Sequence, residues 1–472
     1  MNEEKRLARN TAIIAIGKIC TQFVSFLLLP LYTAMLSTEE YGVVDLITTY
    51  VSLLAPIVTL QMENAIFRYM IEKRGNKKEQ SKIITVSLIS ISVVVLIFVV
   101  IMTGISSFSD NPYLSYLMWN VCICAYSNTF LQIARGFDDQ MGYAVGSFIS
   151  AAGTVVLNVL FIVVFHMGGK GMICAILLGN ALCAVFLFFR NRIYQYIHIS
   201  LYSREILREL LQYSIPLIPN SLSWWIMSAS DRSIILAVLG TAWNGIYSAA
   251  NKFSSIVMVV YNIFNLSWTE SVVLNIDKKE SDEFFKHSLK IVFRFFSCAC
   301  LGLIAIMPFV FPIMINSNYD KAYDQIPILV LAVLCNVVVG LYSAIYVAKK
   351  LTKEIAKTSI ISAIVNLVVN ISLIYFIGIY AASISTLVTS AVMMVWRYID
   401  TKKYLNIHIP FWDIVMTLAW CIVILVTYYV RNQLICALVL CLFLVYCVVL
   451  NFEILKTFYD IAINKIKNKV RG

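Results

Sequence analysis

Long apolar runs of about 20 residues recur along the whole chain and are separated by short polar turns. A helix needs about 20 mostly apolar residues to cross a bilayer. The pattern predicts fourteen transmembrane helices, so we expect an all-α integral membrane protein. Their expected ranges are 11–36, 41–67, 83–107, 114–134, 143–165, 171–189, 213–239, 243–268, 287–315, 322–348, 358–377, 380–396, 411–430 and 434–452.

Composition supports this interpretation. The chain has 472 residues, of which 60% are hydrophobic and 13% are charged, whereas roughly 25% of a soluble domain is charged. A soluble fold of this length would also need polar linkers between domains, and no polar stretch is long enough. A water-soluble protein is therefore excluded.

The distribution of Lys and Arg predicts the orientation of the helices. If the N-terminus is cytoplasmic, 31 of the 37 basic residues fall in cytoplasmic segments and only three fall in outer loops. Positive charge near helix ends stays on the cytoplasmic side, so both termini are expected there. The net charge of +11 is then explained by topology, and no nucleic-acid partner is needed.

Two similar halves are expected. The turns at 36–43 and 239–246 share Leu, Thr and Gly in register, and such repeats are typical of transporters that rock around a midplane site. The segment before residue 213 is charged and amphipathic, with Ser203 as a helix cap. The expected parts are an N-terminal lobe of six helices (1–190), a cytoplasmic linker (191–212), a C-terminal lobe of six helices (213–400), and two further helices with a basic cytoplasmic tail (401–472).

Polar side chains form stripes along several expected helices. In lipid, such a stripe must face protein or water. It lines either a wet cavity or a helix–helix contact made by hydroxyl and amide groups. The stripe members are Asp45, Thr49, Ser52, Pro56, Thr59 and Glu63 in one helix, and Ser248, Lys252, Ser255 and Asn262 in another, flanked by Asn251 and Asn265.

The deepest charges are the main candidates for a substrate site. Lys252 lies about 15 Å into its helix at 1.5 Å per residue, near the bilayer midplane. Asp231 and Arg232 are expected at a similar depth. Together with Lys252 they would form a cluster of net charge +1. The alternative is a neutral Asp231–Lys252 pair that holds the helical hairpin. Arg232 would then be an unpaired cation that needs water or an anion.

Four other charged residues complete the candidate set. Lys18 and Arg68 lie within about two turns of the cytoplasmic surface, so snorkelling explains them as well as substrate binding does. Glu63 is deeper and is a candidate for proton or cation binding. Asp45 is expected near the outer mouth, in a solvated position.

The sequence lacks the residue patterns that are typical of metal binding and of nucleotide binding. The four histidines, at 166, 198, 287 and 408, do not cluster with Cys or acids, so no metal site is expected. A glycine-rich phosphate loop with a lysine is absent. No cofactor and no enzymatic activity are therefore expected. H⁺ or Na⁺ is expected only as a coupling ion.

Short motifs in a fixed order now indicate a family. The chain resembles the oligosaccharide-lipid flippases (Wzx-type polysaccharide transporters) of the superfamily that also contains multidrug exporters and lipid II flippases. The motifs are Asn10-Thr11, Glu40-Tyr41-Gly42, Asn64-Ala65-Ile66-Phe67-Arg68, Gln132-Ile133-Ala134-Arg135-Gly136 with Tyr143-Ala144, Tyr213-Ser214-Ile215-Pro216-Leu217-Ile218-Pro219, Asp231-Arg232, Gly245-Ile246-Tyr247, and Asn366 with Asn370.

The resemblance implies a two-lobed flippase that carries an undecaprenyl-pyrophosphate-linked oligosaccharide across the bacterial cytoplasmic membrane by ion-coupled alternating access, for surface polysaccharide such as capsule or O-antigen. Polymerase and glycosyltransferases of the same pathway would be partners. Arg232 and Lys252, with Lys18 and Arg68, would bind the pyrophosphate. Polar groups such as Asn251 and Asn262 would line the sugar cavity, and Asp231, Glu63 and Asp45 would couple ions or pair charges. A multidrug exporter or lipid II flippase of the same fold is the alternative.

Overall fold

The computed structural model describes residues 26, 28–276, 281–349, 351–405 and 409–452. These residues form helices joined by short turns, and no β-strand occurs among them. They divide into two compact units, Met1–Ser248 and Ala249–Gly472, each with its own set of packed helices. The predicted lobes and linker, with their boundaries at 190, 212 and 400, stay predictions.

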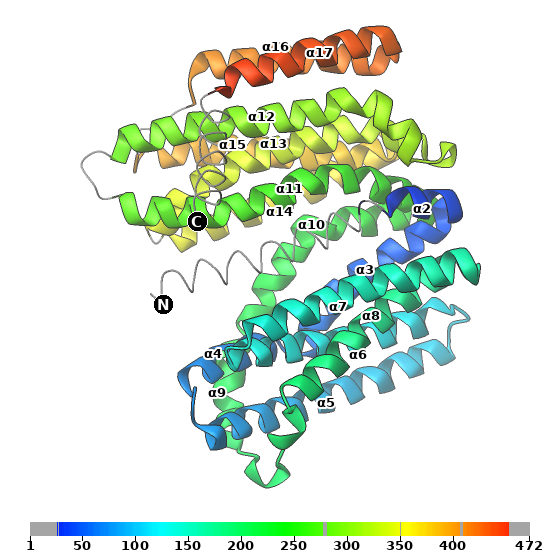
Figure 1. Cartoon of the computed structure of the whole chain (residues 1–472), viewed down its shortest axis with the longest axis vertical. Coiled ribbons are helices and arrows are strands. Elements are labelled where there is room, and N and C mark those ends of the chain that lie inside the picture. Colours follow the sequence, from blue (N-terminus) through cyan, green and yellow to red (C-terminus); the bar gives the residue numbers. More distant parts are fainter. Residues whose placement is uncertain (1–25, 27, 277–280, 350, 406–408, 453–472) are drawn as a thin grey trace, which may run out of the picture. The chain divides into compact units, whose positions relative to one another are not determined.

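The first unit is built around α6, which packs against α3, α4 and α8, while α7 packs on α8 and α10 on α3 (Figure 1). Its core includes Met62, Ile84 and Leu187, each fully buried. A π-helical turn, Val159–Val164, extends α7. The helices are α2 (Leu29–Met35), α3 (Thr38–Val58), α4 (Met62–Glu72), α5 (Lys77–Ser107), α6 (Tyr113–Gly136), α7 (Gln140–Asn158), α8 (Gly168–Arg190), α9 (Arg204–Ser214), α10 (Leu217–Val238) and the first turns of α11 (Thr241–Asn275).

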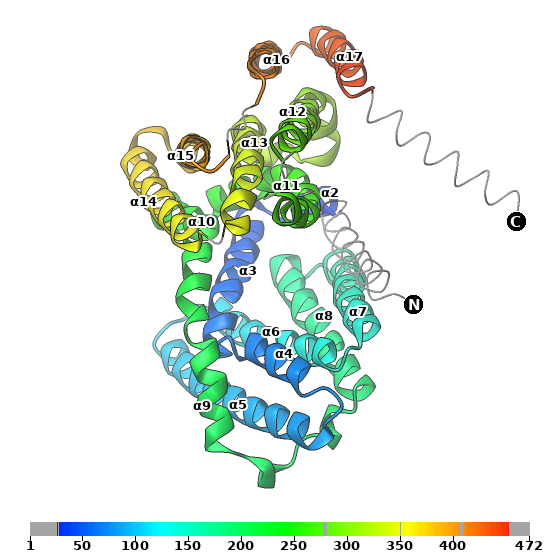
Figure 2. The ribbon, with the colours of Figure 1, turned by 90° about the vertical axis from the view of Figure 1, so that its left-hand side faces the viewer.

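The second unit is built around α13, which packs against both α12 and α15 (Figure 2). Helix α14 packs on α15, and α16 and α17 pack on α12. The helices are the rest of α11, α12 (Ser281–Met314), α13 (Lys321–Ala348), α14 (Thr352–Ile377), α15 (Tyr380–Thr401), α16 (Phe411–Val430) and α17 (Gln433–Leu450).

Eleven helices among the described residues are long and apolar enough to cross a membrane. Helices α6 and α10, with 24 and 22 residues, match the expected spans 114–134 and 213–239 but are not among the eleven. Most of the expected span 11–36 and the basic tail lie outside the described residues. An all-α, multi-pass architecture is therefore confirmed, while fourteen spans and the cytoplasmic termini stay predictions.

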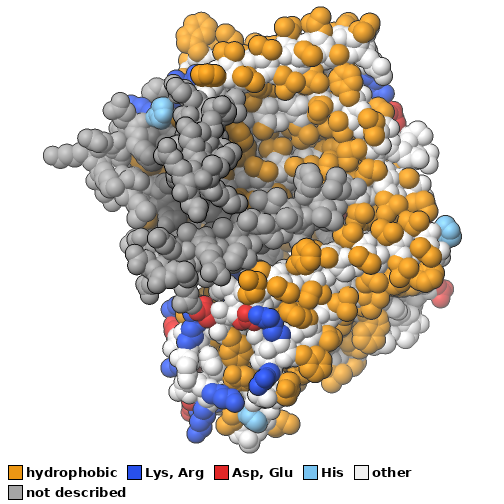
Figure 3. Space-filling view, viewed as in Figure 1, with side chains coloured by type: hydrophobic (Ala, Val, Ile, Leu, Met, Phe, Trp, Pro, Cys, Tyr) orange, Lys and Arg blue, Asp and Glu red, His pale blue; other side chains and the backbone are white. Residues whose placement is uncertain are grey.

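Hydrophobic side chains cover most of the described surface that is visible in Figure 3. On α5, Val93, Leu96 and Val100 are each more than half exposed, as lipid-facing residues are. Charged side chains gather at the end of the first unit near the turn between α4 and α5 (Figure 3). This separation is the one expected for a protein whose polar ends leave the bilayer.

The expected helix at 41–67 is broken, which corrects the sequence prediction. Helix α3 ends at Val58 and α4 begins at Met62, because Leu60 and Gln61 both adopt left-handed backbone conformations (φ 52° and 56°) that end the helix. The Gln61 amide N–H donates to the carbonyl of Pro56. Glu63 consequently lies in the first turn of a new helix.

The amphipathic segment before residue 213 forms a helix with Ser203 as its cap, as the sequence predicted. Helix α9 begins after Ser203, whose hydroxyl accepts a hydrogen bond from the amide of Ile206 at 3.4 Å.

Hydrogen bonds of Asp139 hold the turn between α6 and α7. Asp139 caps α7 by accepting from the Gly142 amide at 2.8 Å, and both its oxygens accept from Arg190, at 2.7 and 3.0 Å. The Arg190 guanidinium lowers the pKa of Asp139 below its ordinary value.

Candidate functional site

The backbones of α3 and α11 touch where two glycines meet. A Cβ atom on Gly42 would lie 1.9 Å from the carbonyl oxygen of Thr241, and one on Gly245 would lie 2.0 Å from that of Thr38. Glycine is therefore required at both positions, as in other close helix crossings within membranes. The two turns that share Leu, Thr and Gly in the sequence thus form one reciprocal contact inside the first unit.

Next to this crossing, Asp45 accepts hydrogen bonds from three side chains. Arg232 Nε lies 2.7 Å from Oδ2, Asn244 Nδ2 lies 3.3 Å from the same oxygen, and Ser248 Oγ lies 2.7 Å from Oδ1. Asn244 also donates to the Gly42 carbonyl at 3.0 Å. We call Asp45, Arg232, Asn244 and Ser248 the Asp45 network.

The Asp45 network is largely shielded from its surroundings. The side chains of Asp45 and Arg232 are 13% and 15% exposed. Charge-assisted hydrogen bonds are stronger than neutral ones, and a shielded pair loses little to screening. The network therefore joins α3, α10 and α11 through a compact, neutral cluster.

Further polar contacts join α10 to its neighbours. Asp231 is buried and accepts a hydrogen bond from the Tyr247 hydroxyl at 3.2 Å. The Trp225 indole N–H donates to the Thr49 carbonyl at 3.0 Å. The polar stripe of α3 thus serves, at least in part, as a contact with α10 and α11.

Two expectations about these charges were wrong. Arg232 is not an excess cation, because Asp45 neutralises it, and the net charge of +1 omitted that carboxylate. Asp45 is not a solvated residue at a mouth, because it is mostly buried and binds three donors. Both errors have one cause, which is the close approach of α3 and α11 at Gly42.

Glu63 occupies the first turn of α4, after the break in the helix. Its Oε2 atom is buried and has no hydrogen-bond partner among the described residues. Nearby, Gln61 is buried and donates to the Ser221 hydroxyl at 2.7 Å. A buried carboxylate oxygen without a donor is costly when ionised, which suits a group that binds a proton or a cation.

The remaining candidates lie elsewhere along the chain. Arg68 is exposed and pairs with Glu72 at 2.9 Å. In the second unit, Asn251 accepts from Ser254 at 2.9 Å, Lys252 is half-buried, and Asn262 is exposed. Lys18 lies outside the described residues.

Sequence reasoning missed Asn244 as a member of the site. It has no charge and lies outside the polar stripe that contains Ser248. A signal was nevertheless present, because Ser248 follows Asp45 by 203 positions, the same offset that relates the two glycine turns. Residues at that offset meet across the crossing.

Comparison with solved structures defines the class of fold. The chain is similar to the lipid II flippase MurJ in an inward closed conformation, with a TM-score of 0.67 and 16% identity over 95% of this chain and 100% of that one. It is also similar to an inward-facing multidrug resistance transporter of the MATE family and MOP superfamily, with a TM-score of 0.63 and 16% identity over 83% and 98% of the chains. The chain therefore has the fold that these two proteins share.

Sequence comparison identifies the family. A family model described as "Polysaccharide biosynthesis protein" matches residues 7–269, more than half of the chain, so the chain belongs to that family. A protein of the Lsg locus of Haemophilus influenzae is 22% identical over 267 residues, which are 55% of this chain and 64% of that relative. The resemblance to the polysaccharide flippases that the sequence motifs indicated is confirmed.

Proposed function

We propose that this protein moves an undecaprenyl-pyrophosphate-linked oligosaccharide from the cytoplasmic to the outer leaflet of the bacterial cytoplasmic membrane. The observation that carries the proposal is the combination of a polysaccharide-biosynthesis family match with a flippase fold over 95% of the chain. Membrane lipids surround the protein, and glycosyltransferases and a polymerase of the pathway would supply and consume the substrate.

The Asp45 network supports a specific role for Arg232. Its guanidinium is neutralised by a carboxylate, and a diphosphate accepts the same planar fork of N–H donors. Exchange of the Asp45 carboxylate for the substrate's diphosphate would keep Arg232 paired throughout, which avoids an isolated charge in the membrane. In this proposal the network is intact in the empty protein and broken in the loaded one.

Release of Asp45 from Arg232 gives a route to ion coupling. A buried carboxylate without its cation binds a proton or a sodium ion in order to stay neutral. Glu63, with its unpaired oxygen, is a second group of this kind. Roles for Asp231, Lys252, Lys18, Arg68, Asn251 and Asn262 stay as the sequence predicts them.

Complementation of a deletion strain tests the proposal. Arg232→Ala and Asp45→Asn should each reduce surface polysaccharide at least tenfold at normal expression, while Lys82→Gln, which removes a pair within α5, should not. Full export by Arg232→Ala would contradict the role of Arg232. Loss of drug resistance in the deletion strain, with normal polysaccharide, would instead support a multidrug exporter.

A further inference from the structure

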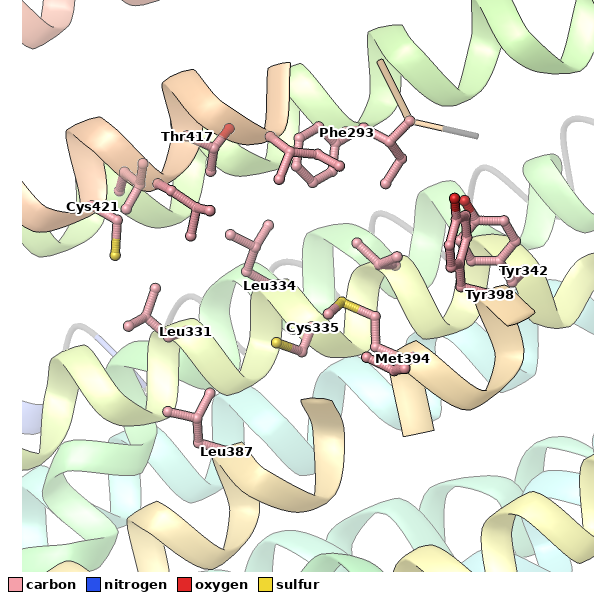
Figure 4. Close-up of a pocket in the computed structure, with 16 residues that line it drawn as sticks. Phe293, Leu331, Leu334, Cys335, Tyr342, Leu387, Met394, Tyr398, Thr417 and Cys421 are labelled. Atoms are coloured by element: carbon pink, nitrogen blue, oxygen red, sulfur yellow. The ribbon is translucent and has the colours of Figure 1, made fainter. Parts of the chain in front are cut away.

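The second unit contains an elongated apolar cavity of about 410 Å³. Its walls come from α12, α13, α15 and α16 (Figure 4). Sixteen residues line it, and most of them are aliphatic, sulfur-containing or aromatic. It opens toward the lipid-facing surface, because Val395 and Leu418 in its lining are 49% and 57% exposed.

The size of the cavity matches one lipid chain in one leaflet. From Leu331 to Tyr342 on α13 it extends 11 residues, or about 16 Å at 1.5 Å per residue, close to half of a hydrocarbon core about 30 Å thick. The cavity therefore has about the length of one acyl chain within a single leaflet, whereas an undecaprenyl chain is much longer than the cavity.

The two tyrosines of the lining lie at one end of the cavity, while the hydroxyl of Thr417, elsewhere in the lining, donates to the carbonyl of Asp413 at 2.7 Å. Tyr342 and Tyr398 lie side by side there, with ring centroids 5.7 Å apart, while Leu331 and Cys421 lie toward the other end (Figure 4). The Tyr342 side chain is 1% exposed, yet its hydroxyl has no hydrogen-bond partner among the described residues. A buried hydroxyl without a partner costs free energy, which a ligand with an ester or phosphate oxygen would recover.

A cation completes this polar end. Lys402 is exposed and places its Nζ 4.3 Å from the centroid of the Tyr398 ring. No carboxylate among the described residues forms an ion pair with it. In the predicted topology this end is cytoplasmic, where the lipid surface carries negative charge. A lipid phosphate at this depth would contact Lys402 while one chain enters the cavity.

We propose that this cavity is a binding site for an anionic glycerophospholipid of the cytoplasmic leaflet. One acyl chain fills the apolar cavity, the Tyr342 hydroxyl donates to an ester oxygen, and Lys402 pairs with the phosphate. The lipid seals α16 against α13 and α15 and is distinct from the transported glycan lipid. The proposal does not depend on which substrate the protein moves.

The first test measures lipid that copurifies with the full-length protein. After reconstitution in nanodiscs of phosphatidylglycerol and phosphatidylcholine, followed by detergent extraction, native mass spectrometry should detect one bound phosphatidylglycerol. Cys421→Phe fills the cavity and should reduce that occupancy at least tenfold, whereas Cys441→Phe, at an exposed position on α17, should not change it. Lys402→Gln should reduce the preference for phosphatidylglycerol over phosphatidylcholine at least threefold.

A second test uses the unsubstituted protein and does not depend on a variant that folds. Cys335 and Cys421 line the cavity, and Cys441 is outside it. In delipidated protein, added phosphatidylglycerol should slow maleimide labelling of Cys335 and Cys421 at least fivefold relative to Cys441, while undecaprenyl phosphate should not. Equal occupancy in Cys421→Phe, equal labelling with and without phosphatidylglycerol, or protection by undecaprenyl phosphate would each overturn the proposal.

Discussion

Removal of one partner of the Asp45–Arg232 pair should lower the free energy of unfolding strongly. Removal of both partners should lower it by much less than the sum of the two single effects. Asp45→Asn leaves a guanidinium 15% exposed without its carboxylate, and breaking a buried pair typically costs about 3–5 kcal/mol. Arg232→Gln leaves the carboxylate with Asn244 and Ser248 as its donors among the described residues. The double variant leaves neither charge, so a coupling energy of about 2–3 kcal/mol is expected.

The assay is a double-mutant cycle on protein in nanodiscs, with unfolding followed by circular dichroism in increasing denaturant. The matched control is the cycle for Glu79 and Lys82, an i, i+3 pair on α5 whose side chains are about 30% exposed. Such a pair contributes about 0.2–0.5 kcal/mol. Additive effects at Asp45 and Arg232, with each single change below about 1 kcal/mol, would refute the argument that the pair is shielded and coupled.

Three further outcomes follow from particular residues. Gly42→Ala should lower the melting temperature by several degrees, because its Cβ would overlap a backbone oxygen, whereas Gly104→Ala, where nothing lies within 4 Å, should raise it slightly. The pKa of Asp139 is lowered in the folded state, so its stabilisation exists above its unfolded pKa of about 3.9 and is lost as the pH falls through the folded pKa. Asp139→Asn should therefore reduce stability at pH 7 and flatten the pH dependence below 4, as thermal scans would show. Glu63→Gln should keep the fold but make transport insensitive to an imposed pH gradient; an unchanged response would exclude Glu63 as the coupling group.

The apolar pattern was sufficient to predict an all-α, multi-pass architecture, because in a bilayer every backbone group of a spanning helix must be satisfied within that helix. The charged, amphipathic segment before residue 213 predicted α9 and its Ser203 cap. The apolar pattern, however, had a limit. It could not show the break after Val58. Leu60 and Gln61 have left-handed conformations that their side chains do not favour, so packing around the break, rather than local preference, determines it.

The charged site was predicted less well than the fold. Asp45 and Arg232 are 187 residues apart in the sequence, and their pairing depends on how closely two helices approach. The position of Arg232 along its helix predicted a buried cation, but it could not predict that Asp45 pairs with it. The glycine at position 42 was visible in the sequence, and only the structure shows that it brings the Asp45 network together.

The most direct test of the account is a translocation measurement in proteoliposomes. An undecaprenyl-pyrophosphate oligosaccharide is placed in the membrane, and its glycan on the opposite face is detected with a membrane-impermeant glycosidase. We predict that the purified protein moves this lipid under an ion gradient, and that Arg232→Ala reduces the rate at least tenfold. Absence of glycan movement by correctly folded wild-type protein, under both a proton gradient and a sodium gradient, would contradict the proposed function.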